Sequence, residues 1–243
     1  GVPYTYEILK KLRFARMTLP SLKYLTQAGG KLSKELSLEF AQVCKEKGIK
    51  FIVMYGQSEA TARMSYLPWE YAISKAGAMG IAIPHGKFSL IDVDGNLITT
   101  PNTTGELVYE GENVTLGYAE CAADLAKGDE RHGRLETGDM ALFDEDGFYS
   151  IVGRKKRFLK IYGNRVNLDE VEGLLKSNGF DCAVGGRDDL MKIFVTDKSQ
   201  LDAVTHFVSE KTGLNHAAFC SEYIESIPRN EAGKILYADL EKL

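Results

Sequence analysis

The sequence predicts an α/β domain followed by a smaller α+β domain. In residues 1–79, two apolar strand-like runs flank an amphipathic helix, which is the order of a βαβ unit. Residues 80–153 consist of short alternating segments separated by turn signals, which indicates a β-rich, barrel-like subdomain. Residues 154–243 carry helices and strands in a compact α+β pattern. We therefore expect a large domain over 1–153 and a small domain over 154–243.

In the first segment, apolar spacing predicts helices over 4–13 and 33–47. Ser33 is a suitable N-cap for the second helix, and Gly48 is a suitable stop. Strand-like runs at 22–26 and 49–54 lie on either side of that helix. The order strand, helix, strand predicts that the two strands are parallel.

Two hairpin signals follow in the second segment. Asp94-Gly95 lies within "KFSLIDVDGNLI", and Asp146-Gly147 lies within "MALFDEDGFYSIVG". In the last ninety or so residues we expect helices over 168–176 and 200–212 and a strand over 192–195. We place the domain boundary in the run "GRKKR", directly after its Gly153, because a cluster of positive charges is rarely part of a hydrophobic core. The alternative interpretation of this run is a solvated surface loop.

The amino-acid composition limits the kinds of binding partner that we expect. The chain has 243 residues, 44% of them hydrophobic, and a formal net charge of -4 with both signs interspersed. This balance argues against nucleic acid as the main partner and against a polybasic anchor, and no apolar run has membrane-spanning length. The four cysteines are far apart and are predicted to be reduced core thiols, and the four histidines form no catalytic set. We expect small ligands and a cytoplasmic location.

Five motifs in a fixed order carry the functional prediction. They are "MYGQSEAT", "GELVYEGENVTLGY", "TGDMALFDEDGFYSIVGR", "KKRFLKIYGNRVNLDEVE" and "PRNEAGKILYADL". In sequence and order they resemble the motifs of the adenylate-forming superfamily, which includes acyl-CoA synthetases, peptide-synthetase adenylation domains and luciferases. The resemblance implies the C-terminal part of a large domain, followed by a small mobile domain. It also implies a two-step reaction, in which ATP and a small carboxylic acid give an acyl-adenylate, and the thiol of CoA or a phosphopantetheine carrier protein then displaces AMP.

The first motif supplies most of the implied nucleotide site. By resemblance, Tyr55 stacks on adenine beside Gly56 and Gln57, Ser58 meets the α-phosphate, and Glu59 binds magnesium. Without its neighbours, Tyr55 would be interpreted as a core aromatic at the end of a strand.

The glycine pair Gly29 and Gly30 resembles the strand end that lies against adenine, although the following Lys31 departs from the usual pattern. Asp139 in "TGD" matches the carboxylate that accepts both ribose hydroxyls, and Arg154 matches the arginine that reaches ribose or phosphate.

The small domain is implied to act in both steps. Lys234 in "AGK" matches the lysine that bridges the carboxylate and phosphate oxygens during adenylation. Lys156 occupies the hinge position, and Lys160 and Gly163 occupy the face that serves thioester formation. Glu170 and Glu172, on the next predicted helix, are interpreted as ordinary surface or first-turn carboxylates.

Other features of the family are missing. No glycine-rich phosphate loop followed by lysine is present, and full-length members are about twice this long. We therefore interpret the chain as the C-terminal half of such an enzyme, weak or inactive alone. The acid is not predicted; Arg63, Tyr66 and Trp69 are candidates for the near wall of its pocket, or packing residues.

The sequence leaves two other functions open. One is a non-catalytic nucleotide-binding module derived from the same family, and a luciferase-like oxygenase is more remote. The charged segment 117–139 suggests a docking site for a carrier protein.

Overall fold

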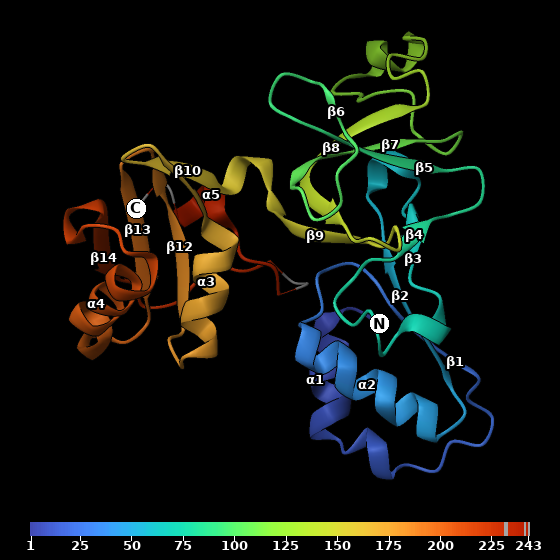
Figure 1. The fold of residues 1–243 in the computed structure, drawn as a ribbon, viewed down its shortest axis with the longest axis horizontal. Coiled ribbons are helices and arrows are strands. Elements are labelled where there is room, and N and C mark those ends of the chain that lie inside the picture. The colour runs from blue at the N-terminus through green and yellow to red at the C-terminus, as the bar shows by residue number, and fades with distance from the viewer. Residues whose placement is uncertain (231–232, 241, 243) are drawn as a thin grey trace. The chain divides into compact units, whose positions relative to one another are not determined.

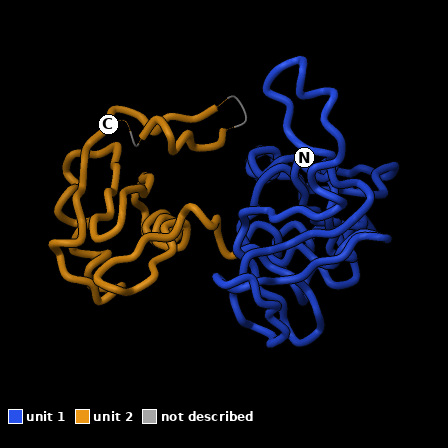
Figure 2. Tube along the Cα trace, turned by 90° about the horizontal axis from the view of Figure 1, so that it is seen from above, with its two compact units in different colours: residues 1–151 blue, residues 152–243 orange. Residues whose placement is uncertain are grey.

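The computed structural model describes residues 1–230, 233–240 and 242. The chain divides into two compact units, residues 1–151 and 152–243, each with its own hydrophobic core (Figure 2). The division falls within strand β9 (Tyr149–Arg154), close to the boundary expected after Gly153.

The first unit begins with the βαβ element that the sequence predicts (Figure 1). Strands β1 and β2 pair in parallel, with Tyr24 opposite Lys50, and the helix α2 connects them. The Ser33 hydroxyl accepts a hydrogen bond from the Leu36 amide, so the predicted N-cap is confirmed. The bounds are α1 Pro3–Lys11, β1 Tyr24–Gln27, α2 Lys34–Glu46 and β2 Lys50–Tyr55, with a 3-10 turn at Phe14–Arg16.

Two short strands and a larger sheet complete this unit. Strands β3 and β4 extend the first sheet in the order β1-β2-β3-β4, and a five-stranded sheet follows in the order β6-β5-β7-β8-β9. Both predicted hairpins are confirmed, because β5 pairs with β6 across Asp94-Gly95, and β8 is the neighbour of β9 across Asp146-Gly147. The bounds are β3 Ser65–Tyr66, β4 Ile81–Ala82, β5 Lys87–Ile91, β6 Leu97–Ile98, β7 Gly105–Glu110 and β8 Arg134–Phe143, with 3-10 turns at Ser58–Ala60, Trp69–Tyr71 and Ala122–Ala126.

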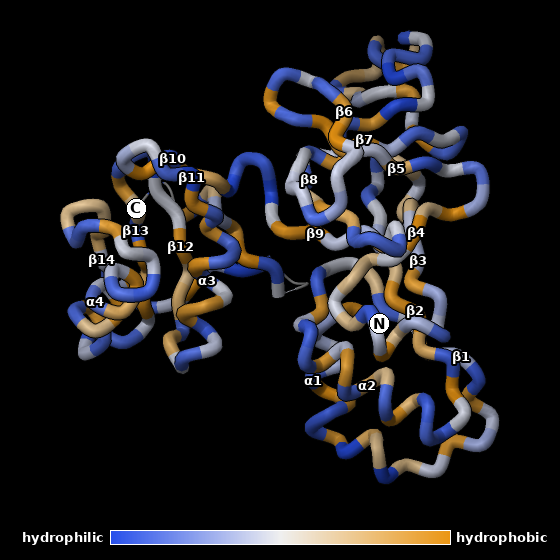
Figure 3. The backbone as a smooth tube through the Cα atoms, in the orientation of Figure 1, coloured by the Kyte–Doolittle hydropathy of each residue, from blue (hydrophilic) through white to orange (hydrophobic). Residues whose placement is uncertain are grey.

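The second unit is the predicted α+β domain. A hairpin of β10 and β11 precedes a three-stranded sheet of order β12-β13-β14, against which α3 and α4 pack. Apolar residues run along β12 and β13, which form the centre of this core (Figure 3). The bounds are β10 Phe158–Ile161, β11 Asn164–Asn167, α3 Leu168–Ser177, β12 Cys182–Arg187, β13 Leu190–Val195, α4 Leu201–Thr212, β14 Phe219–Tyr223 and α5 Tyr237–Leu240, with 3-10 turns at Lys155–Arg157, Lys198–Gln200 and His216–Ala218.

The cysteines are free thiols, but they are not all in the core as expected. Cys44 and Cys182 are buried, and burial raises their pKa to about 11 and about 12 respectively. Cys121 is exposed on the loop between β7 and β8, and Cys220 is half-buried. None of the helices in the described part of the chain has the length and apolar run needed to cross a bilayer.

Candidate functional site

Three of the predicted site residues meet around one buried carboxylate. Tyr55 ends β2 and Asp139 lies within β8, and Tyr55 Oη donates a hydrogen bond to Asp139 Oδ2 at 2.6 Å. Gln57 Nε2 donates to the same oxygen at 2.8 Å and to the Thr137 carbonyl at 2.9 Å. Asp139 is only 2% exposed. The fold therefore brings together a carboxylate, a phenol and a carboxamide from segments more than eighty residues apart.

The turn after Tyr55 is closed by its own backbone. The Gln57 carbonyl accepts hydrogen bonds from the amides of Ala60 at 3.1 Å and Ala62 at 2.9 Å. Thr61 and Ala62 both adopt left-handed backbone conformations, with φ of 55° and 66°. This conformation strains the backbone of a non-glycine residue, and such strain is frequent at functional sites.

Gly56 is required by this crossing of the backbone. A Cβ atom at position 56 would lie 2.4 Å from the Ala62 carbonyl oxygen and 2.7 Å from its carbon. The absence of a side chain at position 56 therefore has a steric role in the fold itself. The glycine first allows residues 56 and 62 to approach each other.

We expect Gly56→Ala to lower the free energy of unfolding by about 3 kcal/mol, because the added methyl group meets backbone atoms that cannot turn aside. Urea denaturation of the chain measures this change. Gly128→Ala is the matched control, since a Cβ there meets nothing within 4 Å. Equal unfolding midpoints for the two variants would contradict the steric role of Gly56.

Glu59 is held by the segment that follows β7. Tyr118 Oη donates to Glu59 Oε1 at 2.7 Å, and this hydrogen bond is the main cause that raises the pKa of Tyr118. The Thr115 amide donates to the Glu59 carbonyl at 2.9 Å. Arg131 donates to Thr115 Oγ1 at 2.7 Å and stacks on Tyr118, 4.5 Å from the ring centroid. Ser58, the neighbouring predicted residue, is exposed.

Sequence analysis missed these partners of Glu59. Tyr118 is the last residue of the motif "GELVYEGENVTLGY", but a motif of this kind does not indicate that its tyrosine contacts Glu59, fifty-nine positions earlier. Tyr118 and Arg131 also line a pocket of about 740 Å³ in the segment that was suggested for carrier docking.

The glycine pair lies at the same edge of the sheet as the Tyr55 turn. Gln27, at the end of β1, is opposite Val53 in the parallel register, so the loops that follow both strands leave the sheet at its carboxyl edge. Buried Gln27 donates from Nε2 to the Gly30 carbonyl at 2.7 Å, and Gly29 has a φ of +80°. Gly29 and Gly30 are exposed. The unusual Lys31 donates from Nζ to the Ile151 carbonyl at 2.9 Å.

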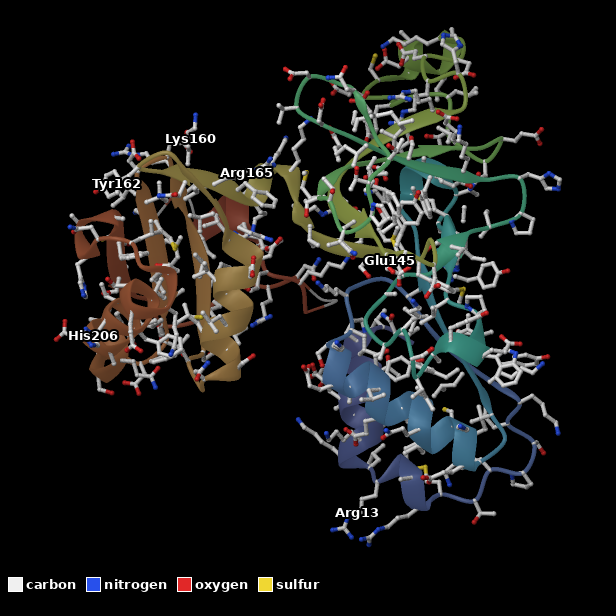
Figure 4. All side chains as sticks on the ribbon, viewed as in Figure 1. Arg13, Glu145, Lys160, Tyr162, Arg165 and His206 are labelled. Carbon is white, nitrogen blue, oxygen red and sulfur yellow. The ribbon has the colours of Figure 1, made fainter. Side chains whose placement is uncertain are left out.

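The other predicted residues belong to the second unit. Arg154 ends β9 and is exposed, and its amide donates to Asp169 Oδ2 at 3.2 Å. Lys156 is exposed in the 3-10 turn, and Lys160 is exposed on β10, where Figure 4 shows its side chain pointing away from the ribbon. Gly163, with φ of +85°, forms the tight turn from β10 to β11.

Lys234 lies on a hairpin near the C-terminus. Arg229 and Ile235 form an isolated antiparallel bridge, and the Asn230 amide donates to the Lys234 carbonyl at 2.9 Å. The Lys234 amide donates back to Asn230 Oδ1 at 2.9 Å, and Arg229 Nη1 donates to the Gly233 carbonyl at 3.0 Å. Glu231 and Ala232 of this motif lie outside the described residues. The backbone at Lys234 is thus fixed, while the residue is exposed.

Similarity to known proteins extends over most of this chain. A family model described as "AMP-binding enzyme" matches residues 1–119. The 2-succinylbenzoate–CoA ligase of Bacillus cereus is 28% identical over 241 residues, covering 95% of this chain and 48% of that protein. The 4-coumarate–CoA ligase-like 2 of Arabidopsis thaliana is 28% identical over 240 residues, covering 94% of this chain and 42% of that protein.

A solved structure gives the same fold. The O-succinylbenzoate coenzyme A synthetase of Bacillus subtilis in complex with AMP matches with a TM-score of 0.75 at 22% identity, covering 99% of this chain and 50% of that chain. The same enzyme in complex with ATP and a magnesium ion matches with a TM-score of 0.73 at 20% identity, over 99% of this chain and 50% of that chain. This chain therefore spans about half the length of the curated relatives that it matches.

Proposed function

Because this chain belongs to the adenylate-forming superfamily, we propose that it is the C-terminal half of an enzyme that activates a carboxylic acid with ATP. In the first step the carboxylate attacks the α-phosphate, and the products are an acyl-adenylate and pyrophosphate. In the second step a thiol attacks the acyl carbon, a thioester forms, and AMP leaves. The chain alone is expected to be weak or inactive, because it has no phosphate loop.

The group formed by Tyr55, Gln57 and Asp139 is the observation that supports the proposal most strongly. A buried carboxylate beside Tyr55, at the carboxyl end of the parallel strand β2, is suited to accept hydrogen bonds from the two ribose hydroxyls. Asp139 has almost no exposed surface. We therefore expect the ribose hydroxyls to replace Tyr55 Oη and Gln57 Nε2 as the hydrogen-bond donors to its carboxylate. Adenine would stack on the Tyr55 ring near Gly29 and Gly30, and Ser58 would meet the α-phosphate.

Glu59 fits the proposed metal. Magnesium prefers oxygen ligands and is bound through one or two carboxylates together with substrate phosphates. Within the described residues there is no group of three or more acidic, cysteine or histidine side chains that could hold a metal by itself. Glu59 would therefore share the ion with phosphate oxygens of ATP, and the ion would neutralise charge on the leaving pyrophosphate.

The second unit supplies the remaining roles of the proposal. Lys234 would bridge the carboxylate and the α-phosphate in the first step, and Arg154 would reach the ribose or phosphate. Lys156 would be the hinge, and the turn with Lys160 and Gly163 would face the thiol in the second step. The exposure of all four charged side chains is compatible with a surface that meets a ligand.

The thiol acceptor and the acid are the finer parts of the proposal. The two relatives named above are CoA ligases, which supports CoA as the acceptor. The segment 117–139, which contains the 3-10 turn Ala122–Ala126, remains the proposed docking site if the acceptor is a carrier protein. Two of the candidates for the wall of the acid pocket differ in their surroundings. Trp69 is 45% exposed, whereas Arg63 Nη1 donates a hydrogen bond to the Ala62 carbonyl at 2.8 Å. The free buried thiols support the cytoplasm as the proposed compartment.

ATP–pyrophosphate exchange tests this function. It should be measured with pooled carboxylic acids on the complete gene product and on this chain alone. We expect acid-dependent exchange in the complete product and little or none in the chain. Full exchange by the chain alone would contradict the half-enzyme interpretation. Nucleotide binding without exchange for any acid would favour the non-catalytic module.

A further inference from the structure

A buried polar network occupies the interior of the second unit. Arg157 is 9% exposed and follows directly after Lys156. Its Nε donates to Asp169 Oδ1 at 2.8 Å, and its Nη2 donates to Glu172 Oε2 at 3.2 Å. Its Nη1 donates to the Val184 carbonyl. Glu172, at 6% exposed, also accepts from the Val184 amide at 3.0 Å. The expectation that Glu172 is a surface carboxylate is therefore wrong.

Tyr237 connects this network to the hairpin that carries Lys234. Tyr237 Oη donates to Glu172, 3.0 Å from either carboxylate oxygen. The guanidinium carbon of Arg157 lies 3.7 Å from the centroid of the Tyr237 ring. Burial raises the pKa of Tyr237, and the nearby Glu172 adds to this shift, so the phenol remains a proton donor across the physiological range.

Among the described residues, a backbone hydrogen bond and apolar packing also hold the hairpin in place. The Leu236 amide donates to the Pro228 carbonyl at 2.9 Å, which closes the hairpin two residues after Lys234. Ile235 and Tyr237 pack with Ile227 and Leu240 against Ala183 and Phe194 of the sheet. A lone two-stranded hairpin is marginally stable in water, so its orientation depends on such contacts with the rest of the unit.

We propose that Tyr237 is a positioning residue, which fixes the Lys234 hairpin to the segment beside Lys156 through Glu172 and Arg157. Arg157, directly after the proposed hinge, and the Lys234 hairpin then behave as parts of one rigid body, although they lie almost eighty residues apart. This inference rests on the proposed function, because the orientation of Lys234 matters only if Lys234 acts on substrate. A displacement of about 1 Å at a reacting group costs as much as a hundredfold in rate.

Tyr237→Phe is the informative substitution. It keeps the ring that stacks on Arg157 and removes only the hydroxyl that binds Glu172. The buried pair of Arg157 and Glu172 stays complete, so the unit should remain folded. Tyr223→Phe is the matched control, since Tyr223 is 40% exposed on β14 of the same unit.

The first measurement is amide hydrogen exchange of the chain, which does not depend on any activity. We expect exchange at residues 233–236 to become about tenfold faster in Tyr237→Phe and to be unchanged in Tyr223→Phe. Unchanged exchange in Tyr237→Phe would overturn the anchoring role.

The second measurement separates the two half-reactions in the complete gene product. We expect Tyr237→Phe to lower kcat of ATP–pyrophosphate exchange about tenfold, with the KM for ATP unchanged. Thioester formation from supplied acyl-adenylate should be unchanged. The comparison requires that Lys234→Ala is inactive. In that case, a Tyr237→Phe variant with faster hydrogen exchange but a normal kcat would overturn the positioning role of Tyr237. If Lys234→Ala is fully active, the proposed role of Lys234 fails instead, and the hydrogen exchange result still decides the anchoring.

Discussion

Lys234→Ala should lower acid-dependent ATP–pyrophosphate exchange by about 10²–10³-fold in the complete gene product, because a cation aimed at developing charge acts mainly in the transition state. The hydrogen bonds between Asn230 and the Lys234 backbone do not involve its side chain, so the hairpin should keep its fold. We expect the dissociation constant for ATP to change less than about threefold. Exchange kinetics and equilibrium titration measure the two quantities separately.

Lys211→Ala is the control for this result. Lys211 is an exposed lysine of the same unit, on α4, and pairs only loosely with Glu210 at 3.4 Å. Its replacement should leave exchange unchanged. Equal activities for the Lys234 and Lys211 variants would show that Lys234 has no part in the chemistry.

Glu172→Ala should lower the free energy of unfolding of the second unit by about 3–5 kcal/mol. The substitution removes one of the two carboxylates that pair with the buried Arg157 guanidinium, so that Asp169 alone compensates this charge. It also removes the acceptor of the Tyr237 hydroxyl, of the Val184 amide and of Lys176 Nζ at 2.5 Å. Chemical denaturation followed by a probe in the second unit measures the loss.

Glu170→Ala provides a matched comparison on the same helix. Glu170 is exposed in the first turn of α3, where an acidic side chain contributes through the helix dipole alone. Its loss should cost less than about 1 kcal/mol. A Glu172 variant as stable as the Glu170 variant would show that the buried network does not stabilise the unit.

The pair of glutamates also shows what the sequence could predict. The pattern Leu168, Val171 and Leu175 marks the buried stripe of α3, and Glu172, four positions after Leu168, lies on that stripe. The apolar spacing predicts the helix, but an acidic residue near a helix start is usually exposed, and this tendency predicts exposure for both glutamates. The partner that makes Glu172 an exception, Arg157, is brought close only by the tertiary fold.

In the first unit, local patterns predicted the longer helices, the parallel strands and the hairpins, but not the short strands β3 and β4. The apolar runs around α2 predicted two parallel strands, and the Asp-Gly turns predicted the hairpins of the larger sheet. The contact of Tyr118 with Glu59 and the crossing of Gly56 over Ala62 were not predicted. The first is a contact between residues fifty-nine positions apart, and the second depends on the backbone path of a single irregular turn, neither of which local sequence patterns specify.

Binding of the ribose of an adenine nucleotide by Asp139 and its neighbours is the core of the proposed function. Calorimetric titration of the complete gene product with AMP and with 2′,3′-dideoxy-AMP tests it directly, in the unsubstituted protein and in Asp139→Asn. Hydrogen bonds to a buried carboxylate contribute about 1.5–3 kcal/mol, so AMP should bind at least about tenfold more tightly than the dideoxy compound. In Asp139→Asn this preference should fall below about threefold. A preference that is absent from the unsubstituted protein, or that survives the substitution intact, would contradict the assignment of Asp139.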